Sequence, residues 1–132
     1  LNQYKNMSIE IIQNNNLLLE ISPKMGASIT KFKNKKKNLN IFRPFPKNKK
    51  ISKYNCYFSG YFITIPYFGA IHKDTFLYNN KYISLIKTHK LEPNTIHGEG
   101  WVNEWEINKI NQNSISLSYL HNGEKSFPYK YK

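Results

Sequence analysis

Residues 101–120 read WVNEWEINKINQNSISLSYL, and at both ends of this stretch large apolar side chains fall mainly on one face of a two-residue period. Within residues 101–107 the two tryptophans fall on one face, and within residues 115–120 large apolar side chains alternate mainly with serine. A period of two is typical of a β-strand that buries one face. The Asn-Gln-Asn sequence at 111–113 separates the two runs, so the stretch predicts a β-hairpin.

Three further stretches predict strands because they are rich in β-branched and aromatic residues and end at turn-forming residues. They are the two apolar runs within 17–32, the run 57–67, which Pro66 should end, and a hairpin within 76–86 that turns at Asn79-Asn80. No window of helical length combines a 3.6-residue period with a start cap and a stop signal. We therefore expect an all-β fold, an antiparallel meander of about seven to nine strands, in a single domain over residues 1–132.

Lysine-rich and proline-containing segments predict loops between these strands. The KNKKKN sequence at 33–38 is expected to be a solvated loop tip, with a nucleic-acid patch as the alternative. Residues 41–53 contain Pro44 and Pro46, which exclude a continuous helix or a central strand and indicate an irregular surface loop. His121-Asn122-Gly123 predicts another turn.

The chain is strongly basic, with a formal net charge of +12 and a pI of about 9.7. A basic chain suggests a polyanionic partner such as nucleic acid or a membrane surface. The excess comes almost wholly from lysine, since Arg43 is the sole arginine, and heavy use of Asn, Ile, Tyr and Phe accompanies it. An AT-rich coding sequence would supply the same residues. Lysines without arginine neutralise phosphates but read few bases, so we expect any nucleic-acid binding to be nonspecific and sensitive to salt.

The single cysteine, Cys56, cannot form an internal disulfide, and we expect it to be a small core residue in a reducing compartment. No spacing of Cys and His residues suggests a metal site. The sequence contains neither a secretory signal nor an apolar run of membrane-spanning length, so the expected location is the cytoplasm, without a membrane partner. The chain starts with leucine and ends in FPYKYK, and both ends look like cuts in a longer protein.

Residues 94–105, NTIHGEGWVNEW, place His97 before Gly98, Gly100 and Trp101. Glycines allow a tight turn and the close approach of a ligand, and a flat aromatic face suits the C–H faces of a pyranose ring. A histidine can donate a proton to a sugar oxygen or accept one. The alternative is a structural histidine beside a buried aromatic pair. Of the other histidines, His72 is expected in an exposed loop, and His89 and His121 are expected to be solvated in turns.

The order of several segments resembles the aldose 1-epimerase, or galactose mutarotase, family over nearly the whole chain. The segments are LLLEISPKMGASITKFK, NIFRPF, FITIPYFGAIHKDTF, NTIHGEGWVNEWEI and SISLSYLHNGEKSFPYKY. The resemblance implies an antiparallel β-sandwich of the galactose-mutarotase type, of which this chain is the N-terminal portion. It also implies that α and β anomers of free aldoses interconvert through the open aldehyde, by acid and base catalysis and without a metal or organic cofactor.

The resemblance assigns roles to three residues. His97 matches the family's first histidine, which lies against the ring oxygen of the sugar and makes His97 the catalytic candidate. Trp101 matches the tryptophan that follows it, and Tyr67 belongs to the substrate loop, so His97, Trp101 and Tyr67 are the substrate-binding candidates. The segment around Pro66 and Tyr67 should then approach His97 across one groove, with Trp101 at the start of the strand behind it.

Two departures from the family pattern count against catalysis by this chain alone. The family's sugar-binding arginine is replaced by Ala70, in the sequence Pro66-Tyr67-Phe68-Gly69-Ala70-Ile71. The family's second histidine, its aspartate and its glutamate base belong to a C-terminal half that this sequence does not contain, and Glu99, Glu104 and Glu106 do not match that base. We therefore expect an inactive, truncated member, to which a companion chain could supply the missing half. The alternative function is a basic β-domain that binds RNA or another polyanion nonspecifically.

Overall fold

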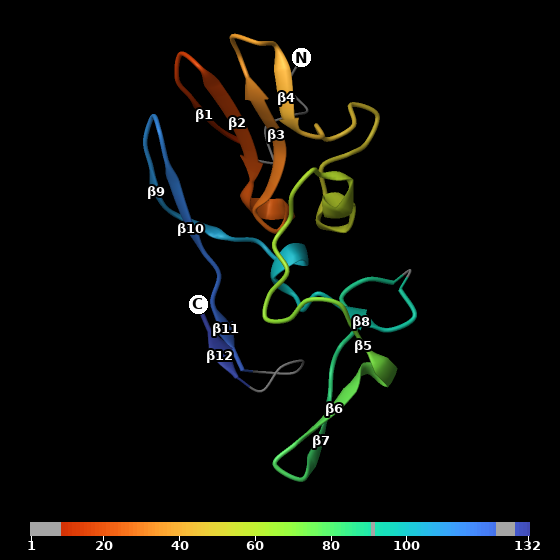
Figure 1. Ribbon diagram of the computed structural model, residues 1–132. Coiled ribbons are helices and arrows are strands. Elements are labelled where there is room, and N and C mark those ends of the chain that lie inside the picture. The colour runs from red at the N-terminus through yellow and green to blue at the C-terminus, as the bar shows by residue number, and fades with distance from the viewer. Residues whose placement is uncertain (1–8, 91, 124–128) are drawn as a thin grey trace.

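The computed structural model describes residues 9–90, 92–123 and 129–132 and consists of antiparallel β-structure with short 3₁₀ helices (Figure 1). The all-β expectation is confirmed. The strands are β1 Glu10–Gln13, β2 Leu17–Ser22, β3 Ser28–Asn34, β4 Leu39–Phe42, β5 Ala70–Ile71, β6 Thr75–Tyr78, β7 Lys81–Ser84, β8 Thr95–Ile96, β9 Glu106–Ile110, β10 Ile115–Ser118, β11 His121–Asn122 and β12 Lys130–Tyr131. The 3₁₀ helices are η1 Pro23–Met25, η2 Lys53–Phe58, η3 His72–Asp74 and η4 Gly100–Val102.

The N-terminal strands form a four-stranded antiparallel sheet in the order β1-β2-β3-β4. The prediction of two strands within 17–32 is confirmed, because β2 and β3 pair from Leu17 with Asn34 to Ser22 with Ser28. The lysine-rich turn after β3 is exposed, as expected. The remaining strands pair two by two, and Figure 1 shows the sheet at one end of the molecule and the β6–β7 hairpin at the other.

Two predicted hairpins are confirmed. The strands β6 and β7 pair around Asn79 and Asn80, whose φ angles of 47° and 57° are the left-handed values that a two-residue hairpin turn requires. The strands β9 and β10 pair around residues 111–114, where the backbone N–H of Asn111 donates to the carbonyl of Ser114. In both hairpins asparagine supplies the turn, because its short polar side chain tolerates positive φ or bonds to nearby backbone.

The predicted strand over 57–67 is wrong. Tyr57 and Phe58 end the 3₁₀ helix η2, and the following residues make only isolated bridges, from Tyr61 to Ile29 and from Ile65 to Gly98. The aromatic residues that suggested a strand pack individually instead, since Ser59-Gly60 interrupts the segment and Pro66 cannot donate to a ladder. The neighbouring stretch 41–53 is irregular after the end of β4, as expected, up to the first residue of η2.

The predicted strand over 101–107 is also wrong in its first half, since Trp101 lies in η4 and β9 begins only at Glu106. The reason is a close approach to the β2–β3 turn. Gly26 has φ of 62°, and a Cβ there would lie 2.0 Å from the carbonyl oxygen of Trp101. The N–H of Gly26 donates to the carbonyl of Asn103 at 3.1 Å. These contacts tie the segment after Gly100 to the first sheet, so it cannot extend as a strand.

A small core joins the sheet to the second half of the chain. Its most buried members are Met25, Cys56, Trp101 and Val102. Cys56 is fully buried, which confirms it as a core residue, and burial raises the pKa of its thiol to about 12, so it stays protonated.

Two of the histidine predictions are wrong. His72 is exposed, as expected, but His89 and His121 are only 9% and 5% exposed. His89 stacks on Trp101 with a centroid distance of 5.6 Å. His121 lies in β11 rather than in a turn and contacts Glu99. Both partners are distant in sequence, so local turn patterns could not indicate burial.

In the part of the chain that the structure describes, no helix is both long and apolar enough to span a membrane.

Candidate functional site

His97 follows β8 and lies beside the segment that contains Pro66 and Gly69. The strands β5 and β8 pair through Ala70 with Ile96, and the ladder continues as the N–H of His97 donates to the carbonyl of Gly69 at 2.9 Å. The N–H of Gly69 in turn donates to Nδ1 of His97 at 3.0 Å. The expected approach of this segment to His97 is confirmed, but the two stretches pair directly rather than facing each other across a groove.

The hydrogen bond to Nδ1 determines the chemical state of the imidazole. Because Nδ1 of His97 accepts a hydrogen bond, it carries no proton, and the hydrogen of the neutral ring is on Nε2. Burial lowers the pKa of His97, an effect that Glu92 partly opposes, so the neutral form predominates at pH 7. Among the described residues, no protein group pairs with Nε2. The ring is thus a neutral donor with one nitrogen fixed and the other available.

The backbone at His97 is held in a left-handed conformation. His97 has φ of 60° and Gly98 has φ of 66°, and this region costs a residue with a side chain about 1–2 kcal/mol. A Cβ at Gly98 would lie 2.1 Å from the carbonyl oxygen of Ile65, so only glycine fits. The same carbonyl accepts hydrogen bonds from the N–H groups of Glu99 and Gly100 at 3.0 and 3.2 Å. Ile65 therefore anchors the loop that presents His97.

Aromatic rings surround His97 on both its buried and its exposed sides. The ring centroids of Phe68, Phe62 and Trp101 lie 5.0, 6.0 and 6.1 Å from that of His97. Trp101 is 3% exposed and donates its indole N–H to the carbonyl of Gly98 at 3.0 Å, so it supports the loop from the core side. Phe68 is 83% exposed, an unusual position for a phenylalanine. The aromatic surface open to a ligand beside His97 is thus that of Phe68.

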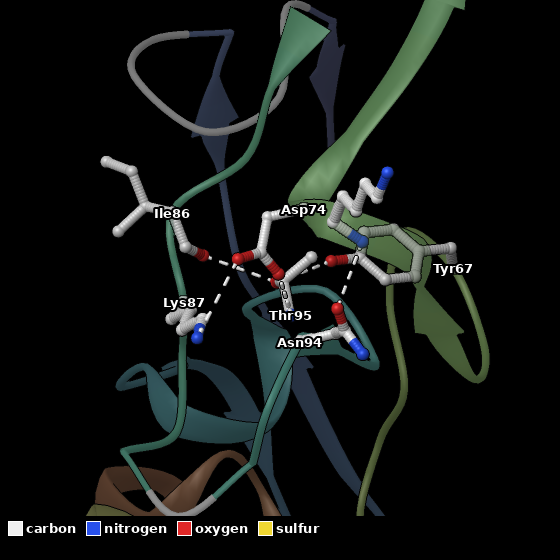
Figure 2. A network of polar contacts seen from close by, with 7 residues as sticks. Tyr67, Asp74, Ile86, Lys87, Asn94 and Thr95 are labelled. Atoms are coloured by element: carbon white, nitrogen blue, oxygen red, sulfur yellow. Dashed lines mark hydrogen bonds and ion pairs between the residues drawn. The ribbon is translucent and has the colours of Figure 1, made fainter.

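Tyr67 directs its hydroxyl toward Thr95 in β8, at 2.9 Å (Figure 2). Thr95 Oγ1 donates its hydrogen to the carbonyl of Ile86 at 3.3 Å, so in the bond between the two hydroxyls Tyr67 is the donor. Burial raises the pKa of Tyr67, which keeps the hydroxyl protonated. The Tyr67 hydroxyl therefore holds the segment around Pro66 onto β8.

The same polar network fixes β8 from its other side (Figure 2). The backbone N–H of Thr95 donates to the carboxylate of Asp74, and Lys87 Nζ lies 3.9 Å from the second oxygen of Asp74. The N–H of Lys73 donates to Asn94 Oδ1 at 3.0 Å. No local sequence pattern indicated Asp74 and Thr95, because the contact between them joins residues 21 positions apart.

Ala70 lies in β5 and is exposed. Its side chain is only a methyl group, at the position where the family pattern, according to the resemblance, has a sugar-binding arginine.

A cavity of about 10 Å³ lies next to Tyr67 and Glu99, and His97 is not among its lining residues. It has room for roughly one water molecule. No group of three or more His, Cys, Asp or Glu side chains able to hold a metal occurs within residues 9–90, 92–123 and 129–132.

Comparisons with known proteins agree on one family. The family model described as aldose 1-epimerase matches residues 7–132. Among curated proteins, none matches the sequence significantly.

Solved structures of three organisms share the fold. A candidate aldose 1-epimerase of Escherichia coli K12 has a TM-score of 0.70 and 22% identity, and the match covers 89% of this chain and 38% of that one. A galactose mutarotase related enzyme of Lactobacillus acidophilus has a TM-score of 0.66 and 21% identity, with coverage of 93% and 36%. An aldose epimerase homologue of C. elegans has a TM-score of 0.68 and 18% identity, with coverage of 94% and 39%. The chain thus has the galactose-mutarotase type of β-fold and spans between 36% and 39% of the length of these proteins.

Proposed function

Because the chain belongs to the aldose 1-epimerase family, we propose that it forms the His97 side of a site in which the α and β anomers of a free aldose interconvert. The observation that carries the proposal is the state of His97. The ring is neutral, its Nδ1 is held by the N–H of Gly69, and its Nε2–H is available to an oxygen of the ligand. Such a donor is suited to the ring oxygen of a pyranose.

In the proposed reaction the bond between the anomeric carbon and the ring oxygen breaks. The anomeric hydroxyl loses its proton to a base and the ring oxygen takes a proton from an acid, neither of which this chain supplies in our proposal, and the open aldehyde results. A neutral imidazole is a weak acid, so His97 polarises the ring oxygen through a hydrogen bond as negative charge develops there. Rotation about the adjacent carbon–carbon bond and ring closure by the reverse steps give the other anomer.

The aromatic residues near His97 have different roles in this proposal. Phe68 presents an exposed ring 5.0 Å from that of His97, where it can pack on the C–H face of a sugar whose ring oxygen reaches Nε2. Trp101 is buried and supports His97 from behind, at 6.1 Å between the ring centroids. Tyr67 contributes its ring and its position, since its hydroxyl is bonded to Thr95.

The remaining walls and acid–base groups of such a site come from elsewhere in our proposal. The cavity of about 10 Å³ beside Tyr67 is not lined by His97 and is too small for a monosaccharide, so it is not the sugar site. The solved relatives are more than twice as long as the matched portion. We assign the base, and the second donor that the family pattern implies, to the part of the family fold that this sequence does not span.

The proposal is tested by titrating the 132-residue chain with galactose and with glucose while recording NMR signals. We expect saturable shifts of the His97 ring nitrogens and of the Phe68 ring, with a dissociation constant on the order of millimolar or weaker, because few contacts are available. His97→Ala should remove the response.

The matched control is His72→Ala, which changes an exposed histidine outside the site and should leave the sugar response intact. Sugar-dependent shifts that survive His97→Ala, or that centre on the first sheet, would place the ligand elsewhere and overturn the assignment.

A further inference from the structure

Glu99 lies two residues after His97, and its side chain contacts the C-terminal strands rather than the His97 ring. Tyr119 follows β10, and its hydroxyl donates to Oε1 of Glu99 at 2.7 Å. His121 in β11 contacts the same oxygen through Nδ1. The carboxylate of Glu99, in the loop that presents His97, therefore contacts two side chains from a different part of the chain.

Asn103 also belongs to this cluster, and its hydrogen bonds show which group donates in the bond between Tyr119 and Glu99. Its Nδ2 donates both to the Tyr119 hydroxyl at 3.1 Å and to the backbone carbonyl of Glu99 at 3.0 Å. Since Tyr119 accepts from Asn103, its own hydrogen is available to Glu99. Burial and the adjacent Glu99 carboxylate raise the pKa of Tyr119, so the hydroxyl remains protonated and keeps donating.

The side chains of Glu99 and His121 are largely buried. His121 is 5% exposed and the side chain of Glu99 is 17% exposed. A carboxylate at this depth is costly unless its hydrogen bonds are made, so the native position of Glu99 is strongly favoured over others. The backbone of Glu99 is fixed at the same time, by donation of its N–H to the carbonyl of Ile65.

We propose that Glu99 is a positioning residue for His97, and that Tyr119 and His121 act on the site through it. The proposal rests on the function assigned to His97 above. Only Gly98 separates the two residues, and both His97 and Gly98 have left-handed φ angles. An unrestrained loop would relax from that conformation and lose the bond from Gly69 to Nδ1 of His97. Holding Glu99 on both its backbone and its side chain opposes this relaxation.

The test uses the 132-residue chain without sugar, so it does not depend on whether sugar binds. The variants are Glu99→Ala, which removes the carboxylate, and Glu99→Gln, which keeps the shape and one acceptor oxygen. Nitrogen NMR of the His97 ring reports the tautomer, and hydrogen exchange reports the Gly69 N–H. The N–H of Ile29 in β3 of the first sheet, which donates to the carbonyl of Tyr61, serves as an internal reference.

In Glu99→Ala we expect Gly69 to exchange at least about tenfold faster than in the unmodified chain while Ile29 is unchanged, because local opening adds to the exchange of one region only. The His97 ring should become a mixture of tautomers. Glu99→Gln should retain most of the protection and the single tautomer, as a conservative rescue. Glu104→Gln, a change of an exposed glutamate in the same segment, should have no effect.

Unchanged Gly69 exchange and an unchanged His97 tautomer in Glu99→Ala would overturn the proposal. So would an equal acceleration at Gly69 and Ile29, which would make Glu99 a general contributor to stability. If Glu99→Ala does not fold, His121→Ala is measured in the same way, and selective acceleration at Gly69 is again the required result.

Discussion

The hydrogen bond between the Gly69 N–H and Nδ1 of His97 links the protonation of the ring to the structure of its neighbour. Protonation of Nδ1 would break this bond, and burial lowers the pKa of His97 below its ordinary 6.5. The unfolded chain therefore binds a proton at His97 more readily than the folded chain. The contribution of His97 to stability is present above pH 6.5 and is lost as pH falls through the lower folded pKa.

We predict that the Gly69 amide signal titrates together with His97, with a midpoint below 6.5. The measurement is a pH series of ¹H–¹⁵N NMR spectra of the 132-residue chain. His97→Gln should abolish the titration at Gly69, whereas His72→Gln should not. A midpoint above 6.5, or a Gly69 signal that ignores pH, would show that the ring is not held through Nδ1.

Two glycines of the site have positive φ and differ in the space around them, which makes them a matched pair. A Cβ at Gly98 would meet the carbonyl oxygen of Ile65 at 2.1 Å, whereas a Cβ at Gly69 would have nothing within 4 Å. We predict that Gly69→Ala costs about 1–2 kcal/mol of unfolding free energy, through backbone strain alone. Gly98→Ala should cost roughly 2–5 kcal/mol, because a steric clash is added. Urea unfolding of both variants measures the difference, and equal costs would contradict the described loop.

Single residues also mark the limit of sequence reasoning here. The glycines around His97 indicated a sharp loop, and the expected approach of the Pro66 segment was correct. His121 and Glu99 were each set aside, because the contact between them joins residues 22 positions apart. Burial of a polar side chain depends on contacts that only the folded chain creates, so no local pattern carried that information.

At the scale of elements, prediction succeeded where a turn and its two strands are contiguous. The β6–β7 hairpin and the β2–β3 pair formed where they were expected, and the β9–β10 hairpin has the expected turn, although β9 overlaps the expected strand 101–107 only at Glu106 and Ile107. It failed over 57–67 and at the start of 101–107, where aromatic side chains with an apparent strand pattern serve tertiary packing instead. Trp101 is in a 3₁₀ helix because the chain must pass the backbone of Gly26, a contact between residues far apart.

The β6–β7 turn offers a test at this scale. Asn79 and Asn80 both have positive φ, and the second position of such a turn prefers glycine. We predict that Asn80→Gly stabilises the chain by roughly 0.5 kcal/mol, because glycine adopts this conformation without strain. Asn40→Gly, within β4 and paired with Lys33, should instead destabilise by about 0.5–1 kcal/mol. Thermal unfolding of the two variants gives the signs, and destabilisation by Asn80→Gly would contradict the turn geometry.

At the scale of the whole molecule, the first sheet and the site share one small core around Trp101. The TM-scores of 0.66 to 0.70 show that the fold is shared with the longer relatives. Much apolar surface stays open, including Leu39 at 57% and Ile110 at 46%. In our proposal the chain supplies one wall of a site and its support, and the rest of the longer family fold supplies the other walls.

That division leads to a prediction about catalysis. A neutral His97 can polarise a ring oxygen, but anomer interconversion also requires a base for the anomeric hydroxyl, and each acid or base typically contributes a factor of roughly 10² to 10⁴. Glu99 is engaged by Tyr119 and His121 rather than directed at His97, and our proposal assigns the base to the part of the family fold that this sequence does not span. We predict that the 132-residue chain accelerates the mutarotation of glucose or galactose negligibly. Polarimetry against buffer, with His97→Ala as the reference, measures this. A rate clearly above buffer that disappears in His97→Ala but survives in His72→Ala would show that the chain supplies its own base.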